Sequence, residues 1–330
     1  MVVTTRSRST NNSARFIIDT VPDSTASATE SVAAAADAAG SAPEPAEVAS
    51  AKMMSELRFK PLCRCHEVPQ FLRQNFIERG YRGEISDTRA ILLSLFRLHN
   101  ETFNVWTHLV ATIGVVALGI YTILYYSSIA TLDQLIAFSL FFLSAGACFL
   151  LSSIYHLFSC HSFAVYRKVI VLDYMGVFTL ILGSFLSGLH FSFHCFPTAR
   201  MVYQGGILLL CLSGCVLALM PAFDAPQFKL WRVASYVATA GFAVFPLVHG
   251  AFLFGSENTW RWWSVLALYG LGLFFYVSKF PESKFRGRFD IFFASHQIWH
   301  VCVVLAAFWH YCTLHHFLHR ITTESCDQFV

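Results

Sequence analysis

The sequence predicts an all-α membrane protein, a bundle of seven transmembrane helices with a cytoplasmic N-terminus and an extracellular C-terminus. Of its 330 residues, 55% are hydrophobic and only 13% are charged, whereas a soluble globular domain carries about 25% charged residues. The mean hydropathy is +0.54. Apolar runs near the roughly 20 residues that a bilayer core requires recur along the chain, with short connections between them. These observations exclude an ordinary soluble domain, and we expect no nucleic-acid partner.

Two segments precede the first apolar run. Residues 1–50 are rich in Ser, Thr, Ala, Pro and Glu, a composition that buries too little apolar surface to fold and is typical of a disordered tail. Residues 51–100 interleave arginines with leucines and phenylalanines. This pattern predicts short amphipathic helices that lie on the cytoplasmic surface of the membrane and face anionic lipid.

Seven apolar runs make up the transmembrane domain, residues 101–320, and residues 321–330 form an extracellular tail. The connections after the second, fourth and sixth runs carry several lysines and arginines, and so does the segment before the first run. The other connections carry few basic residues. Because basic loops stay in the cytoplasm, this bias places the N-terminus inside and the C-terminus outside. The predicted runs are 104–127, 135–157, 169–191, 202–220, 232–254, 262–279 and 295–317.

The predicted orientation assigns each polar residue within a run to a depth in the membrane. Ser152 and His156 lie one helical turn apart near the cytoplasmic end of the second run, and Asp173 lies near the cytoplasmic end of the third. His296 and His300, also one turn apart, begin the seventh run. Residues four apart share a helix face. The five side chains are therefore expected to meet in one layer.

This set of side chains points to a metal. Three neutral imidazoles with an open fourth position are the ligand set of a catalytic zinc, so His156, His296 and His300 are the predicted Zn²⁺ ligands. Asp173 could bind the metal, hold a water molecule or act as a general base, and Ser152 could orient a ligand or stabilise charge on a carbonyl oxygen. Hydrogen bonding between helices and a proton path are the competing interpretations. Haem fits poorly, since its axial ligands must face each other across the ring.

Other residues receive weaker assignments. His108 lies at the same depth in the first run but has no partner close to it in the sequence. His249 follows Pro246 and is expected to satisfy backbone groups that the proline frees. Three cysteines share the outer side, so a disulfide among them can form, and the pairing is open; they are Cys195, Cys312 and Cys326.

Several short motifs resemble those of a known family. They run from Asn100 to His108 (NETFNVWTH), from Ser152 to His156 (SSIYH), from Leu172 to Gly176 (LDYMG), from Phe280 to Glu282 (FPE, followed by an FD pair) and from Ser295 to His300 (SHQIWH). With these motifs and similar loop lengths over residues 60–320, the chain resembles the progestin and adipoQ receptor family, and within it the adiponectin receptors.

The resemblance carries implications for the fold and the site. It implies seven helices with a cytoplasmic N-terminus and a zinc ion held by His156, His296 and His300. It implies that Asp173 reaches the metal through water, and that Ser152 matches a serine of the wider superfamily that includes alkaline ceramidases. Family members act as receptors for adiponectin-like ligands and in lipid and membrane homeostasis, and some are similar to ceramidases.

The leading functional hypothesis is zinc-dependent hydrolysis of a ceramide-like lipid amide by a multi-pass protein of the plasma membrane. The partner would be a ceramide, sphingolipid or fatty acid in an intramembrane cavity, while an extracellular protein ligand and a homo-oligomer stay open. The main alternative is a signalling receptor whose zinc is purely structural, and a transporter is a third. Arg232 lies at an end of the fifth run, so a contact between a basic residue and lipid inside the cavity is not carried over from the family.

Overall fold

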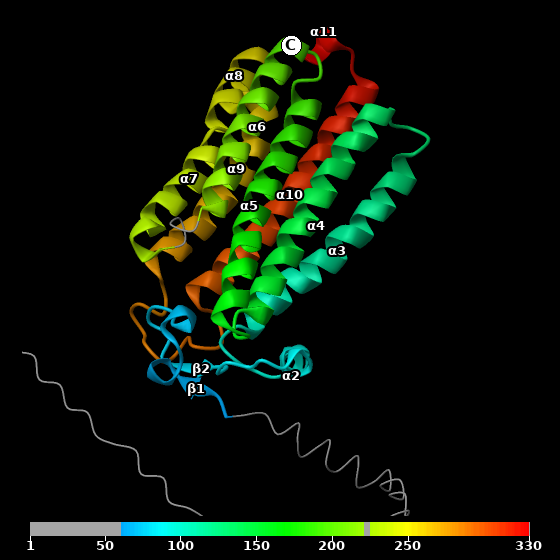
Figure 1. The fold of residues 1–330 in the computed structure, drawn as a ribbon. Coiled ribbons are helices and arrows are strands. Elements are labelled where there is room, and N and C mark those ends of the chain that lie inside the picture. Colours follow the sequence, from blue (N-terminus) through cyan, green and yellow to red (C-terminus); the bar gives the residue numbers. More distant parts are fainter. Residues whose placement is uncertain (1–60, 221–224, 330) are drawn as a thin grey trace, which may run out of the picture. The chain divides into compact units, whose positions relative to one another are not determined.

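The computed structural model describes residues 61–220 and 225–329, so the predicted disordered tail, residues 1–50, lies outside the described residues. Eight long helices run side by side in a bundle (Figure 1). They are α3 (Thr102–Tyr126), α4 (Leu132–Phe158), α5 (Phe163–Ser192), α6 (Pro197–Leu219), α7 (Lys229–Gly241), α8 (Val244–Phe254), α9 (Ser256–Ser278) and α10 (Ser295–Thr323).

Six stretches of the described residues are long and apolar enough to cross a membrane. They are α3, α4, α5, α6, the combined α7 and α8 stretch Lys229–Phe254, and α10. These correspond to six of the seven predicted runs. The remaining run, 262–279, falls almost entirely within α9, a helix of 23 residues that is not among the six. The all-α membrane fold is thus confirmed, and the seventh span stays a prediction.

The helices follow one another around the bundle. Neighbours in the chain pack together from α3 to α7 and from α8 to α10, and α10 returns to contact α3. Helix α10 also contacts α5, so its histidines face several neighbouring helices. Glycine allows the closest approach between α4 and α5, because a Cβ atom on Gly183 would lie 1.9 Å from the Ser144 hydroxyl. Small residues commonly permit such close packing in membranes.

Local sequence explains where several helices begin or break. Helix α4 starts at a capping box, in which the Gln134 side chain accepts a hydrogen bond from the Thr131 backbone at 3.0 Å. Helix α7 ends at Gly241, and α8 begins at Val244. Pro246 explains this break, because it lacks an N–H group and its ring clashes with the carbonyl group four residues earlier.

The segment before the bundle differs from the prediction. Strand β1 (Cys63–Arg64) pairs antiparallel with β2 (Arg79–Tyr81), and three short 3-10 helices and one six-residue helix, α2 (Thr88–Leu93), complete it. The segment is therefore a short ladder with turns, and α2 is its only α-helix among the described residues. The backbone N–H of Asn100 donates to the Gly80 carbonyl at 2.8 Å. This bond attaches the ladder to the start of α3.

The opposite end of the bundle is cross-linked. A disulfide joins Cys195, between α5 and α6, to Cys326, the first residue of the short helix α11 (Cys326–Phe329). This resolves the pairing that the sequence left open. Helix α11 lies at the end of the bundle far from β1 and β2 (Figure 1).

Candidate metal centre

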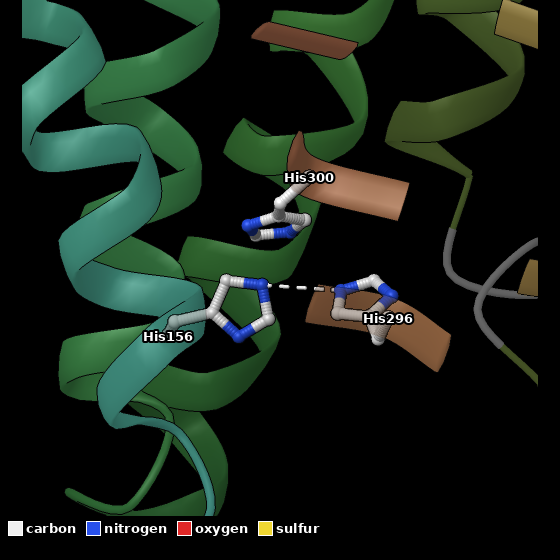
Figure 2. Close-up of side chains that lie close together, drawn as sticks. All are labelled: His156, His296 and His300. Carbon is white, nitrogen blue, oxygen red and sulfur yellow. Dashed lines mark hydrogen bonds between the residues drawn. The ribbon is translucent and has the colours of Figure 1, made fainter. Parts of the chain in front are cut away.

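Three histidines from two helices converge at the end of the bundle where β1 and β2 lie, which we call the inner end. His156 comes from the last turn of α4, and His296 and His300 come from the first two turns of α10. One nitrogen from each imidazole lies within 4.8 Å of the others, and the Nε2 atoms of His156 and His296 are 3.3 Å apart. Figure 2 shows the three rings turned toward one another. The structure thus brings together the three residues predicted to bind zinc.

His156 is fixed on both its ring and its backbone. Its Nδ1 atom donates a hydrogen bond to Glu101 Oε2 at 2.8 Å, which leaves Nε2 to face the other two histidines. The buried guanidinium group of Arg82 donates to the His156 carbonyl at 2.7 Å and to the Ser94 hydroxyl at 2.8 Å. Hydrogen bonds of this kind on the far nitrogen set the orientation and basicity of metal-binding histidines.

His300 is oriented in the same way from α3. Its Nδ1 atom donates to the Asn104 carbonyl at 3.2 Å and lies 3.3 Å from the Thr107 hydroxyl. The His108 ring stacks on the His300 ring, with centroids 3.8 Å apart and planes 8° apart. His108 therefore has a stacking partner, His300, which the sequence spacing did not reveal. Neither His108 nitrogen has a hydrogen-bond partner among the described residues.

The start of α10 is anchored by a buried carboxylate. Glu282 accepts hydrogen bonds from the Ser295 backbone N–H at 2.8 Å and from the Ser295 hydroxyl. A carboxylate at this place satisfies the free N–H groups of the helix and favours the positive end of its dipole. Because His296 is the next residue, this anchor fixes the position from which the first histidine projects.

A cavity of about 690 Å³ opens beside the histidines and continues between α5, α9 and α10. Asp173 and Ser152 both line it. Asp173 is not part of the group whose ligand atoms lie within 4.8 Å of one another. The two predicted catalytic residues therefore face the histidines' cavity without joining their cluster.

The mouth of the cavity at the inner end is basic. Arg232 lines it together with Lys229 and Lys279. The Arg232 guanidinium also lies 5.6 Å from the centroid of the Tyr174 ring. Because the cavity extends to the inner ends of α5 and α7, a residue at the end of a predicted span still reaches it.

The donor set fits a zinc ion. Nitrogen ligands about 2.05 Å from a tetrahedral ion are about 3.3 Å from one another, and the two Nε2 atoms of His156 and His296 are separated by 3.3 Å. At that distance the two Nε2 atoms cannot both carry a proton, because the two hydrogen atoms would point at each other and clash. Each Nδ1 hydrogen bond to Glu101 or Asn104 leaves Nε2 as the unprotonated ligand atom.

Charge around the site is balanced by Glu101, which lies just before α3. Burial opposes ionisation of this carboxyl group, but His156 and hydrogen bonds from His156 and Asn104 outweigh burial and lower its pKa to about 2. At the mouth, burial and the neighbouring Lys229 lower the pKa of Lys279 to about 8. A carboxylate beside the histidines thus supplies negative charge where a divalent cation would lie.

Comparison with known proteins places this site in a family. A family model described as haemolysin-III related matches residues 96–311, a region that includes all three histidines. The chain belongs to this family. It is 34% identical over 257 residues to the adiponectin receptor protein of Drosophila melanogaster, covering 76% of this chain and 58% of that protein. It is 33% identical over 276 residues to progestin and adipoQ receptor family member 3 of Mus musculus, covering 80% and 88%.

Another relative is progestin and adipoQ receptor-like protein 1 of Caenorhabditis elegans, 32% identical over 278 residues. The match covers 82% of this chain and 64% of that protein. The chain therefore spans less than two thirds of the length of two of its relatives. The resemblance to the progestin and adipoQ receptors that the motifs indicated is confirmed.

Two residues that contact the histidines, Glu101 and Arg82, were not predicted from the sequence. Glu101 stands among the residues that precede the first apolar run, yet Glu101, Asn104 and His108 are spaced to share one face of α3. Polar residues at that spacing, ending in the histidine His108, are the signal from which Glu101 could have been predicted to face the site. Arg82 gave no such signal, because it lies 74 residues before the carbonyl group that it contacts.

Proposed function

We propose that this member of the haemolysin-III related family is a zinc-dependent hydrolase of a ceramide-like lipid amide that regulates lipid metabolism and membrane homeostasis. The observation that carries the proposal is the cluster of His156, His296 and His300 at the inner end of a cavity also lined by Asp173 and Ser152. Three imidazoles with room for a fourth ligand are typical of catalytic rather than structural zinc sites.

The zinc ion would act as a Lewis acid and lower the pKa of a bound water molecule to about 7. His156, His296 and His300 would hold the ion, with Glu101 and the Asn104 carbonyl orienting two of the rings. In amide hydrolysis the carbon–nitrogen bond breaks, the water oxygen joins the acyl carbon, and the amine nitrogen gains a proton. An Asp173 carboxylate oxygen would accept the proton from water and return it to that nitrogen, while Ser152, which lines the same cavity, would stabilise charge on the carbonyl oxygen.

The substrate would enter this cavity from the membrane. Its wall is largely apolar between the polar inner end and the outer part, as expected for a site that accepts an acyl chain. Lys229, Arg232 and Lys279 at the inner mouth would attract an acidic head group or a released carboxylate. The proposed ligand is therefore a ceramide, sphingolipid or fatty acid that lies along the cavity.

We further propose the membrane topology that the charge pattern predicts. Helix α9 packs against α8 and α10 and has 23 residues, enough to cross a bilayer, so it would be the seventh span. The Cys195–Cys326 disulfide supports an extracellular C-terminal end, since disulfides persist in oxidising compartments. These features support a multi-pass protein of the plasma membrane with a cytoplasmic N-terminus.

A receptor with a structural metal is the second candidate. The ligands come from α4 and α10, two helices that make few direct contacts with each other, so a metal would join them. Relatives are named adiponectin receptor and progestin and adipoQ receptor. On this hypothesis an extracellular protein binds the outer face, the chain can form a homo-oligomer, and no lipid is cleaved.

One experiment separates the two candidates. The metal content of the purified full chain and its hydrolysis of a short-chain ceramide would be measured on the same sample, for the wild type and for Asp173→Asn. One zinc per chain, with turnover that falls by about 10²-fold or more in the variant, supports the hydrolase. One zinc without turnover of any lipid amide supports the receptor, and absence of zinc contradicts both.

A further inference from the structure

The outer part of the cavity contains buried polar groups that the proposed chemistry does not use. Ser184 on α5, Trp262 and Tyr269 on α9, and His310 on α10 line this part of the cavity, and the Ser187 hydroxyl on α5 lies beside His310. A second polar region therefore exists within the same cavity.

Several of these groups lack hydrogen-bond partners. In the part of the chain that the structure describes, neither the Trp262 indole N–H nor the hydroxyl groups of Ser184 and Tyr269 have one. Trp262 is 9% exposed and Ser184 is 8% exposed. Leaving a buried polar group unpaired costs about 1–3 kcal/mol, so the buried indole N–H indicates an occupant that pairs with it.

His310 and Ser187 give the region a fixed frame. His310 Nε2 lies 3.4 Å from the Ser187 hydroxyl, and the His310 ring stacks on Phe141 with centroids 4.9 Å apart. The Trp262 ring meets His310 edge to face at 5.0 Å. A Cβ atom on Gly188 would lie 3.3 Å from the Trp262 ring and 3.5 Å from the His310 ring. The indole is therefore held in place, and its N–H has a defined direction.

The distance between the two polar regions sets the length of the ligand. His300 and His310 are ten residues apart on α10, which corresponds to about 15 Å along the helix axis at about 1.5 Å per residue. The wall between the two regions is apolar and includes Val177, Leu180 and Val303. An extended chain of single bonds advances roughly 1.2 Å per bond, as an extended backbone does. The second region therefore lies roughly ten to twelve bonds from a group at the histidines.

We propose that the cavity selects an acyl chain carrying an oxygen function, such as a hydroxyl group, roughly ten to twelve bonds from the carbonyl carbon held at the histidines. This inference rests on the proposed function, because it assumes that an acyl group lies with its carbonyl end at the inner histidines. The N–H of the Trp262 indole, whose ring packs against His310, donates to the oxygen of the chain. The apolar wall between excludes chains that carry the oxygen closer to the carbonyl.

The test measures binding rather than turnover. The purified full chain in phosphatidylcholine nanodiscs is titrated with octadecanoic acid and with the same acid carrying one hydroxyl group on its twelfth or on its second carbon. One net hydrogen bond corresponds to about a fivefold gain in affinity. The wild type is expected to bind the acid hydroxylated on the twelfth carbon about fivefold tighter than octadecanoic acid, with no gain for the isomer hydroxylated on the second carbon.

The change Trp262→Phe removes this donor while keeping the shape of the cavity. It is expected to reduce the preference toward equality without weakening the binding of octadecanoic acid. Trp263→Phe is the matched control, since Trp263 is an exposed neighbour that does not line the cavity, and it should keep the full preference.

The outcomes separate this inference from the function on which it rests. Equal affinity of the wild type for all three acids, or a preference that survives Trp262→Phe, overturns the inference and leaves the lipid cavity intact. A gain for the isomer hydroxylated on the second carbon overturns it as well, because recognition would then be at the inner end. Binding of none of the acids overturns the lipid-binding cavity together with this inference.

Discussion

Glu101 offers the sharpest test of the candidate metal centre, through the substitution Glu101→Gln. The carboxylate oxygen that accepts from His156 at 2.8 Å also accepts from the Asn104 amide at 2.6 Å, and its other oxygen accepts from Gln74. A glutamine can place its own oxygen where Oε2 lies and its NH₂ group toward Gln74, whose amide can turn to present its oxygen. The hydrogen bonds can therefore be kept while the negative charge is lost.

The expected loss is in metal affinity. Substitution of the group that hydrogen-bonds a metal-binding histidine typically weakens metal affinity by about 10- to 100-fold, which is about 1.4–2.8 kcal/mol. Here the charge faces the ring at 2.8 Å and is buried, so the effect should lie within that range. The zinc affinity of the purified full chain would be measured by competition with a chromophoric chelator.

A matched control separates this effect from a general change of charge. Glu84 is exposed on the same side of the protein, and Glu84→Gln should leave the zinc affinity unchanged. If Glu101→Gln binds zinc within twofold of the wild type, the carboxylate does not tune the histidines and the reasoning is wrong. A lower melting temperature in the metal-free variant with unchanged affinity would assign Glu101 a structural role alone.

Three further predictions concern stability. Arg82→Met should lower the melting temperature, because each hydrogen bond lost from a buried guanidinium costs about 1.5–3 kcal/mol; an unchanged thermal unfolding curve would contradict it. Burial lowers the pKa of Lys279 from 10.5 to about 8, so the unfolded chain binds the proton more tightly and stability should rise between those pH values. Melting temperatures of Lys279→Met should lack this rise, whereas the exposed-site control Lys284→Met should keep it. Cys326→Ser opens the disulfide to Cys195, which closes a separation of 131 residues, and should cost about 2–5 kcal/mol of unfolding free energy; equal denaturation midpoints with and without the bond would refute this.

The helices and three histidines were accessible to sequence reasoning because membranes impose simple rules. A bilayer fixes the length of an apolar run, and the charge of the loops fixes a direction for each run. Together they gave His156, His296 and His300 a common depth, and the structure brings those rings together. The spacing of Glu101 to Asn104 and His108 was a signal for the residue that orients the His156 ring. Arg82, which contacts the backbone of His156, was out of reach, because it lies in the polar segment before the bundle, where no periodic pattern indicates which side chains turn inward.

The cavity was the other feature that the sequence could not provide. Ser184, Trp262 and His310 each look like single polar residues on apolar helices, and helix–helix hydrogen bonding is the ordinary explanation for such residues. Only the packing of α5, α9 and α10 shows that they face one space and that two of them lack partners among the described residues. In a medium without water such groups must find partners within the protein or on a ligand. The same packing that assembles the histidines at one end of the cavity therefore also turns polar groups into it about 15 Å further along α10.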